Sequence, residues 1–218
     1  QTNNMTDILS AAEAIAMAVD GYNIVDVRGP SDFARGHLKG ALNLPFSQKG
    51  LAQRLSDLWP HGSDIILIAD SAEQADSGKE QLTAGGYSFK GTVLANLDSW
   101  RKERLPTDTI EEISLEALAT EISEGKLTVL DVREPIEWEM GHVPEATLIS
   151  LGELHNRTIE LPRDSKLAVI CEAGIRSSTA VSLLKGIGFS NIVNVPDGTG
   201  GYRVAGFPLL YFSHRGDS

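Results

Sequence analysis

Cysteine is almost absent from this sequence, which has one residue of that type, Cys171, among 218. A single thiol excludes an intramolecular disulfide and a zinc site made of several cysteines. A chain without structural disulfides needs no oxidising compartment, so we expect a cytoplasmic location. We expect neither a metal nor a cofactor.

Basic residues and long apolar runs are also scarce. Lys and Arg together number 19 against 30 Asp and Glu, which gives a formal net charge of −11. Nucleic acids and anionic membranes select basic surfaces, so we expect neither as a partner. No stretch approaches the roughly 18 apolar residues of a membrane-spanning helix. The chain starts at Gln1 without a Met or a secretory signal pattern, so we expect a processed form or a piece of a longer protein.

An internal repeat divides the chain into two halves. Residues 25–28 read Val-Asp-Val-Arg and residues 36–38 read Gly-His-Leu. The related sequences Leu-Asp-Val-Arg and Gly-His-Val follow 105 positions later. A period of about 100 residues is too long for a solenoid and indicates two copies of one domain. We place the first domain at residues 7–107 and the second at residues 111–213.

Each half alternates between patterns typical of strands and of helices. Continuous apolar runs favour strands that are buried on both faces of a parallel sheet. Such runs lie at residues 24–27, 65–69, 129–132 and 167–170. Helical patterns lie between them, as at residues 178–185, and Ser10 and Ser114 precede two others as N-caps. The sequence predicts an α/β fold with two domains, each a parallel β-sheet flanked by helices.

The segment around Cys171 carries the chemistry. Residues 169–178 read Val-Ile-Cys-Glu-Ala-Gly-Ile-Arg-Ser-Ser, so a strand ends, a six-residue loop closes on Arg176, and a helix begins. Ligands bind at the carboxyl ends of parallel strands, and the N–H groups of a helix N-terminus favour a thiolate or an anion. Gly174 permits a backbone conformation that side chains disfavour, and Arg176 can bind an oxyanion. A strand-terminal cysteine is more commonly a small core residue, but these neighbours favour a reactive thiol.

Both halves resemble rhodanese-like domains, and the second half carries three motifs of that family in order. The early motif (Asp-Val-Arg-Glu, Glu-Trp and Gly-His-Val-Pro-Glu-Ala) lies within residues 131–146, the Cys-x-x-Gly-x-Arg loop is residues 171–176, and the closing motif is residues 197–208. Asp197 and Tyr202 depart mildly from the family, which usually has Gly and Trp in the closing motif.

The resemblance implies transfer of sulfane sulfur. Cys171 would attack thiosulfate or a thiol persulfide, become a cysteine persulfide, and pass the outer sulfur to cyanide, sulfite or glutathione. Arg176 would hold the anionic group of the donor. The other residues expected to bind the substrate are Glu172, Ala173, Gly174, Ile175 and Ser177. Ser177 either hydrogen-bonds the sulfur or caps the following helix, and we favour capping.

Two details of the loop bear on the substrate. Four residues separate Cys171 from Arg176, whereas the similar loops of Cys-dependent phosphatases have five, so phosphatase chemistry is a remote alternative. Glu172 follows the nucleophile directly, and an acidic group there weakens the binding of a dianion unless its side chain points to solvent. Glu172 therefore favours a thiol persulfide or a protein donor over thiosulfate.

The first half lacks this chemistry. Asp70 stands where the second half has Cys171, and no residue matches Gly174 or Arg176, so we expect a catalytically silent domain. Features that recur in both halves are then architectural. They are the pairs Asp26–Arg28 and Asp131–Arg133, for which we expect ion pairing, and His37 and His142, which we do not expect to be general bases.

Two functions stay open at this point. The chain is a sulfurtransferase acting on small molecules, or it is a sulfur-relay module that docks a partner domain or protein. Some rhodanese pairs similar to this one follow a persulfide dioxygenase domain, and the chain could be the rhodanese part of such a fusion. Turnover with small donors and acceptors favours the enzyme, whereas persulfide formation without turnover favours the relay. An unreactive Cys171 would indicate a scaffold.

Overall fold

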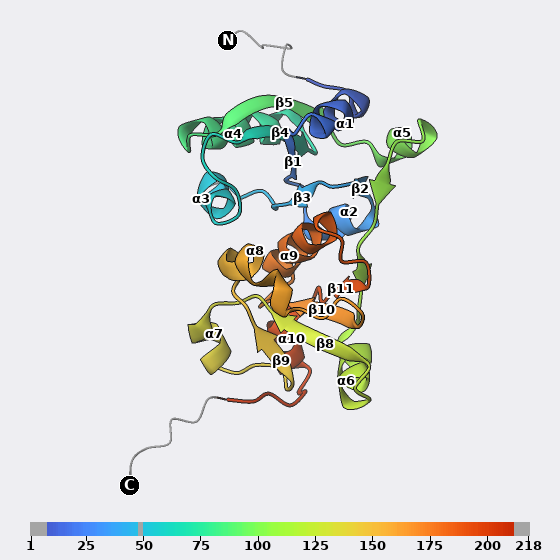
Figure 1. Ribbon diagram of the computed structural model, residues 1–218, viewed down its shortest axis with the longest axis vertical. Coiled ribbons are helices and arrows are strands. Elements are labelled where there is room, and N and C mark those ends of the chain that lie inside the picture. Colours follow the sequence, from blue (N-terminus) through green and yellow to red (C-terminus); the bar gives the residue numbers. More distant parts are fainter. Residues whose placement is uncertain (1–7, 48–49, 212–218) are drawn as a thin grey trace. The chain divides into compact units, whose positions relative to one another are not determined.

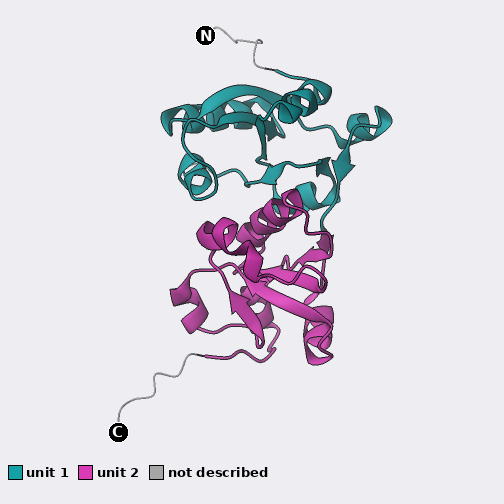
Figure 2. Ribbon diagram, viewed as in Figure 1, with its two compact units in different colours: residues 1–110 teal, residues 111–218 magenta. Residues whose placement is uncertain are grey.

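The computed structural model describes residues 8–47 and 50–211. The chain divides into two compact units, unit 1 (Gln1–Ile110) and unit 2 (Glu111–Ser218), which Figure 2 shows in teal and magenta. Residue 7, which opens the first predicted domain, and residues 212–213, which close the second, lie outside the described residues.

Unit 1 contains a four-stranded parallel sheet in the order β3-β1-β4-β5 (Figure 1). Its strands are β1 (Asn23–Asp26), β3 (Leu42–Asn43), β4 (Asp64–Ala69) and β5 (Ser88–Leu94), and a separate antiparallel pair is formed by β2 (His37–Leu38) and β6 (Thr107–Asp108). Its helices are α1 (Ala11–Val19), α2 (Pro30–Arg35), α3 (Leu51–Ser56), α4 (Ala72–Ala84) and α5 (Leu97–Lys102). Helix α4 packs on β4 and β5, and α1 packs on β1.

Unit 2 contains a five-stranded parallel sheet in the order β7-β11-β10-β8-β9. Its strands are β7 (Glu111–Glu112), β8 (Leu127–Asp131), β9 (Ala146–Leu148), β10 (Lys166–Ile170) and β11 (Ile192–Asn194). Its helices are α6 (Leu115–Ser123), α7 (Pro135–Glu139), α8 (Leu154–Arg157), α9 (Ile175–Gly186), α10 (Gly198–Val204) and the 3-10 turns η2 (Leu151–Glu153) and η3 (Thr158–Glu160). Helix α9 packs on β10 and β11, and α6 packs on β8.

The two sheets have the same topology. Strands β3, β1, β4 and β5 of unit 1 correspond in order to β9, β8, β10 and β11 of unit 2. Even β7, the edge strand of unit 2, has a counterpart, because Ile8 forms an isolated parallel bridge with Thr92 in β5. The prediction of an α/β fold with two parallel sheets flanked by helices is confirmed.

The central strands are buried as their apolar runs predict. Residues 65–69 of β4 and residues 167–170 of β10 have no exposed surface, because each strand has a neighbour on both sides and helices pack on the sheet. The predicted N-caps are also confirmed: Ser10 Oγ accepts the N–H of Glu13, and Ser114 Oγ accepts the N–H of Ala117, both at 3.2 Å. Among the described helices, none combines the length and the apolar character that crossing a bilayer requires.

Candidate active site

Cys171 lies directly after β10, at the carboxyl end of the central strand of unit 2. Its side chain is buried, with 1% of its surface exposed, and the thiol lies 3.4 Å from Ser177 Oγ as a hydrogen-bond donor. Four residues, 171–174, connect β10 to α9. The helix therefore starts at Ile175, before Arg176, and the prediction that the helix follows a six-residue loop is wrong by two residues.

Glycines fix the path of this short loop. Gly174 has a φ of +78°, and a Cβ at this position would lie 2.2 Å from the carbonyl oxygen of Pro196. Gly198, in the closing motif, has a φ of +64°, and its Cβ would lie 2.3 Å from the carbonyl oxygen of Glu172. Only glycine fits both the left-handed conformation and the close approach of the two backbones. The active-site loop and the closing motif are thus packed backbone to backbone.

Two backbone hydrogen bonds hold that contact. The N–H of Thr199 donates to the carbonyl of Cys171 at 2.8 Å, and the N–H of Gly200 donates to the carbonyl of Glu172 at 3.0 Å. The first turn of α10 therefore anchors the residue that bears the thiol. The sequence motif marks residues 197–208 as important, but it gives no sign of this partner.

Ser177 does not cap α9. Gly174 occupies the N-cap position, and Ser177 lies three residues into the helix with its side chain fully buried beside the thiol. The favoured interpretation of a cap is wrong because the left-handed glycine starts the helix earlier than the sequence pattern indicates. The contact with sulfur is the arrangement that the structure shows.

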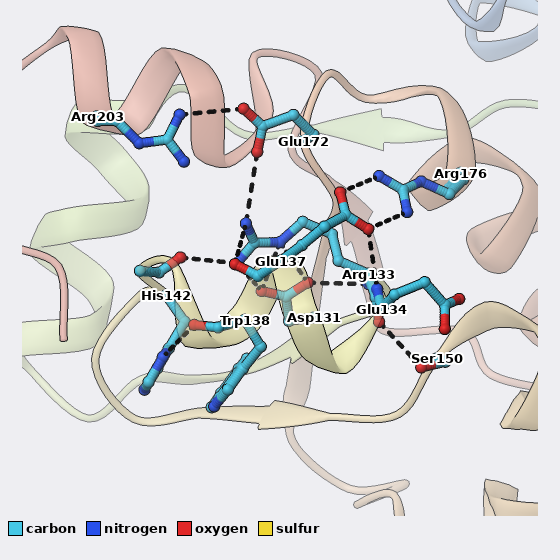
Figure 3. Close-up of polar contacts among 11 residues, drawn as sticks. Asp131, Arg133, Glu134, Glu137, Trp138, His142, Ser150, Glu172, Arg176 and Arg203 are labelled. Carbon is cyan, nitrogen blue, oxygen red and sulfur yellow. Dashed lines mark hydrogen bonds and ion pairs between the residues drawn. The ribbon is translucent and has the colours of Figure 1, made fainter. Parts of the chain in front are cut away.

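Arg176 is held by a carboxylate from another element. Its Nη1 donates to Glu137 Oε2 at 2.6 Å and its Nη2 donates to Glu137 Oε1 at 2.7 Å, so the pair is bidentate (Figure 3). Glu137 belongs to α7, where its Oε2 also accepts the N–H of Glu134 at 3.0 Å. Glu137 belongs to the early sequence motif, but that motif does not identify it as the partner of Arg176.

The side chain of Glu172 is also paired. It accepts a hydrogen bond from Arg133 Nη1 at 3.4 Å and one from Arg203 Nη1 at 3.1 Å (Figure 3). Neither partner is identified by the sequence motifs. The negative charge of Glu172 is therefore offset by two guanidinium groups, and the alternative that this side chain only points to solvent does not describe the structure.

The Asp-x-Arg pairs form the predicted ion pairs in both units. Arg133 Nη2 lies 2.7 Å from Asp131 Oδ2, and Arg28 Nη2 lies 2.6 Å from Asp26 Oδ2. All four side chains are buried, and each arginine also donates to a glycine carbonyl eight residues along the chain. In unit 2, Arg133 additionally contacts Glu172, so the shared ion pair reaches the active-site loop only there.

The histidines that recur in both units are structural. His142 Nδ1 lies 3.0 Å from the carbonyl oxygen of Trp138, and the two rings stack with centroids 3.6 Å apart. His37 repeats this arrangement with Phe33, at 2.9 Å and 3.7 Å. The same contacts occur in the unit with the thiol and in the unit without it, so they belong to the shared fold.

The charges around Arg176 shift two ionisation equilibria. The hydrogen bonds from Arg176 are the main cause that lowers the pKa of Glu137 to about 2, and the neighbouring charge of Arg133 acts in the same direction. In turn, the Glu137 carboxylate raises the pKa of Arg176, and the charges of Cys171 and Glu134 add to that effect. Both members of the pair are charged at neutral pH, within electrostatic reach of the thiol.

Two of the predicted substrate-binding residues are exposed: Ala173 lies in the loop, and Ile175 is the first residue of α9.

In unit 1 the corresponding connection between strand and helix is different. Asp70 is exposed after β4, and Ser71 caps α4 by accepting the N–H of Gln74 at 3.2 Å. A cavity of about 470 Å³ remains beside Asp70, lined by charged side chains that include Arg28 and Asp98. Unit 1 therefore keeps a hollow at this place but has no thiol in it.

Comparisons with known proteins match both units. The model of the rhodanese-like domain family matches residues 10–101 and 114–204. "Putative sulfur carrier protein YrkF" of Bacillus subtilis (strain 168) is 41% identical over 142 residues, which is 63% of this chain and 75% of that protein. "Probable adenylyltransferase/sulfurtransferase MoeZ" of Mycobacterium tuberculosis is 37% identical over 75 residues, which is 34% of this chain and 19% of that protein. The chain thus spans about three quarters of the first relative and a fifth of the second.

Among solved structures, a rhodanese-related protein from Thermoplasma volcanium is 37% identical to this chain, with a TM-score of 0.44. The match covers 47% of this chain and 99% of that chain. The two segments that match the family model lie one in each unit and together make up well over half of the chain. The chain therefore belongs to the rhodanese-like domain family and carries that domain twice.

Proposed function

We propose that unit 2 is a sulfurtransferase that moves sulfane sulfur through a persulfide on Cys171. The observation that carries this proposal is the position of the thiol. It lies at the end of the central parallel strand, on a glycine-shaped loop, beside Ser177 and at the N-terminus of a twelve-residue helix. The N–H groups of the first helical turn lack partners within the helix and stabilise negative charge there.

The proposed transfer takes place in two nucleophilic displacements at the sulfane sulfur. In the first, the Cys171 thiolate attacks the outer sulfur of a donor, the S–S bond of the donor breaks, and the donor leaves as sulfite or as a thiolate. In the second, a nucleophilic acceptor takes the outer sulfur and Cys171 leaves as the thiolate. No external oxidant is consumed, because the sulfane sulfur carries its oxidation state with it.

The neighbouring residues have separable roles in this scheme. Ser177 hydrogen-bonds the sulfur, and Gly174 sets the path of the loop. We propose that the donor approaches the buried thiol past Ala173 and Ile175, which are exposed. Arg176 is held at the site by the carboxylate of Glu137, and Glu172 is paired with two arginines.

A sulfur relay between proteins is the second candidate. Its specific support is the name of one relative, "Putative sulfur carrier protein YrkF". The relatives described above give no support to a fusion with a persulfide dioxygenase. The loop of unit 1 has Asp70 in place of the nucleophile, so we propose that unit 1 takes no covalent part in either function.

The test is the intact mass of the chain after incubation with thiosulfate or, separately, with glutathione persulfide. We expect a gain of one sulfur atom on Cys171 that disappears on addition of glutathione, sulfite or cyanide. Continuous turnover supports the enzyme, and a stable persulfide that is discharged only by a partner protein supports the relay. A thiol that iodoacetamide labels readily but that takes up sulfur from neither donor would contradict transfer from small molecules, and a thiol that resists both would contradict the whole proposal.

A further inference from the structure

The strongest unexplained feature of unit 2 is the pairing of Arg176, the arginine nearest in sequence to the thiol. An arginine that receives the anionic group of a substrate must present N–H donors to it. Here Nη1 and Nη2 both donate to the carboxylate of Glu137, at 2.6 and 2.7 Å. The bidentate geometry leaves the charge of Arg176 largely neutralised by a group that is itself part of the protein.

The position of Glu137 is fixed independently of Arg176. Glu137 is the third residue of α7, and its Oε2 accepts the N–H of Glu134 at the start of that helix. The carbonyl of Glu137 accepts a hydrogen bond from Arg133 Nη1 at 3.3 Å. The carboxylate is therefore held toward Arg176 by its own helix and is not a mobile surface group that a substrate would displace easily.

The other guanidinium groups of the site are also paired. Arg133 is joined to Asp131 and Glu172, and Arg203 is joined to Glu172 (Figure 3). These ion pairs and the Arg176–Glu137 pair leave each guanidinium group facing at least one carboxylate. This balance offers no excess of positive charge to a doubly charged oxyanion.

We propose that Glu137 is a specificity-determining residue that neutralises Arg176, so that the Cys171 site favours thiol persulfides over thiosulfate as sulfur donors. The inference rests on the proposed sulfurtransferase function and names its donor class. Thiosulfate carries two negative charges at the end that must enter the site, whereas a thiol persulfide carries at most one on its sulfur atoms. In the favoured step, the Cys171 thiolate takes the outer sulfur of R–S–SH and R–S⁻ leaves.

Unit 1 indicates that this pairing belongs to the chemistry and not to the architecture. Asp32 stands 105 positions before Glu137, at the corresponding place in α2. It pairs with Arg35 of its own helix, and both side chains are exposed. The shared fold therefore does not need an ion pair between this helix and the helix that follows the central strand. The pair between Glu137 of α7 and Arg176 of α9 is found in the unit that has the thiol.

The test uses the charge of a reagent that reacts with Cys171 directly. Iodoacetate is an anion and iodoacetamide is neutral, so the ratio of their rates reports the electrostatic environment of the sulfur. Glu137→Gln keeps the shape and removes the charge, and we expect it to raise the iodoacetate-to-iodoacetamide rate ratio about tenfold. Glu139→Gln is the matched control, since it removes the same charge from an exposed position of the same helix, and we expect a change below about twofold.

The donor preference is measured on the same proteins. We expect Glu137→Gln to raise kcat/KM for thiosulfate about tenfold and to change kcat/KM for glutathione persulfide less than about threefold. Equal effects on both donors, or an unchanged alkylation ratio, would overturn the inference. A wild-type protein that takes sulfur from neither donor contradicts the proposed function instead, and the alkylation ratio still reports whether Glu137 screens Arg176.

A measurement on the wild-type protein covers the case in which Glu137→Gln does not fold. Sulfate has the charge and shape of thiosulfate but no sulfane sulfur. We expect sulfate to give little protection of Cys171 against iodoacetamide in the wild type, because Arg176 is already paired. Strong protection at millimolar sulfate would show that the site accepts a dianion although Arg176 is paired with Glu137, and would overturn the inference.

Discussion

Units 1 and 2 have the same sheet topology, but they differ in the connection between the central strand and the helix that follows it. In unit 1, β4 is joined to α4 by Asp70 and Ser71, and Ser71 caps the helix from an extended conformation with φ −145°. In unit 2, the connection runs from Cys171 to Gly174 and ends in a left-handed glycine with φ +78°. Two additional residues thus convert an ordinary capped turn into a loop that curves beside a thiol.

The difference teaches which parts of the domain serve the fold alone. Both units keep the buried Asp-x-Arg pair, the stacked histidine and the fully buried central strand. Among the described residues, unit 2 alone has the thiol, the arginine paired with a carboxylate of another helix, and the backbone contact with α10. The rhodanese-like fold therefore forms without the cysteine loop, which is a feature of unit 2.

The largest expected effect is the loss of sulfur uptake when the thiol of unit 2 is removed or is moved to unit 1. Cys171→Ser should abolish sulfur uptake completely, because the chain has no other cysteine. In the double variant Cys171→Ser/Asp70→Cys, the thiol is moved to the exposed end of β4 in unit 1. We expect this thiol to be labelled by iodoacetamide but to support no turnover, since unit 1 lacks the glycine loop and a matching arginine.

Intact mass and the rate of thiocyanate release from thiosulfate and cyanide measure the two outcomes. Turnover by the double variant would show that a strand-terminal thiol is sufficient in this fold and that the loop of unit 2 is dispensable. It would also show that the loop of unit 1 is not the reason why this unit is catalytically silent.

The next largest effect tests the buried aspartate–arginine ion pair, which both units have. Arg28→Met and Arg133→Met each leave a fully buried aspartate without its ion partner, so we expect each to lower the free energy of unfolding by about 3–5 kcal/mol. Burial raises the pKa of Asp26, and the hydrogen bonds and charge of Arg28 act against that shift, so removal of Arg28 disfavours the aspartate anion further. Urea unfolding with a probe in each unit measures the loss.

A paired replacement is the control for this comparison. Asp26→Leu combined with Arg28→Met removes both charges and should cost less than Arg28→Met alone, because no unpaired charge remains buried. If Arg28→Met were neutral while Arg133→Met was severe, the pair would be part of the active site only, and its recurrence in unit 1 would have no structural meaning.

The sequence predicts the fold well because the fold depends on patterns that are local. Apolar runs identify the central strands, and serine before a helical pattern identifies the N-caps of α1 and α6. The repeat itself separates structure from chemistry, since a feature present in both copies cannot depend on Cys171. These arguments need no knowledge of which residues meet in space.

The pairings within the site are less predictable because they join distant segments. Glu137 meets Arg176 from 39 residues away, and Glu172 meets Arg203 from 31 residues away. The start of α9 is misjudged for a related reason: the conformation of Gly174 is set by its contact with Pro196, not by its neighbours in sequence. The sequence signal for Glu137 is its place in the early motif of residues 131–146, which does not name its partner.

A smaller effect concerns the glycine that distinguishes the two loops. Gly174→Ala combines a left-handed conformation with a Cβ placed 2.2 Å from the carbonyl oxygen of Pro196, so we expect a loss of about 2–5 kcal/mol in stability. Gly125→Ala is the matched control, because Gly125 also has a positive φ, +64°, but no atom lies within 4 Å of the added Cβ. There we expect about 1–2 kcal/mol.

Both variants are compared by urea unfolding and by the rate of sulfur uptake. Gly174→Ala should also slow sulfur uptake, since the loop must move away from Pro196, whereas Gly125→Ala should leave the rate unchanged. Equal stability losses in the two variants would mean that the close approach of the backbones adds nothing to the cost of the left-handed conformation.

The smallest expected effect is the contribution of the Glu137–Arg176 pair to stability, and its pH dependence identifies it. Binding to Arg176 lowers the pKa of Glu137 from about 4.5 to about 2, so the folded state favours the ionised carboxylate. The stabilisation is therefore present above pH 4.5 and is lost as the pH falls toward 2. We expect Glu137→Gln to be less stable than the wild type by on the order of 1 kcal/mol at pH 6, with the difference closing between pH 4.5 and 2.

Asp32→Asn in unit 1 is the control and should show a smaller difference, because the Asp32–Arg35 pair is exposed. Urea unfolding midpoints across this pH range compare the two variants. A gap for Glu137→Gln that is independent of pH would mean that the glutamate stabilises unit 2 through packing rather than through its charge.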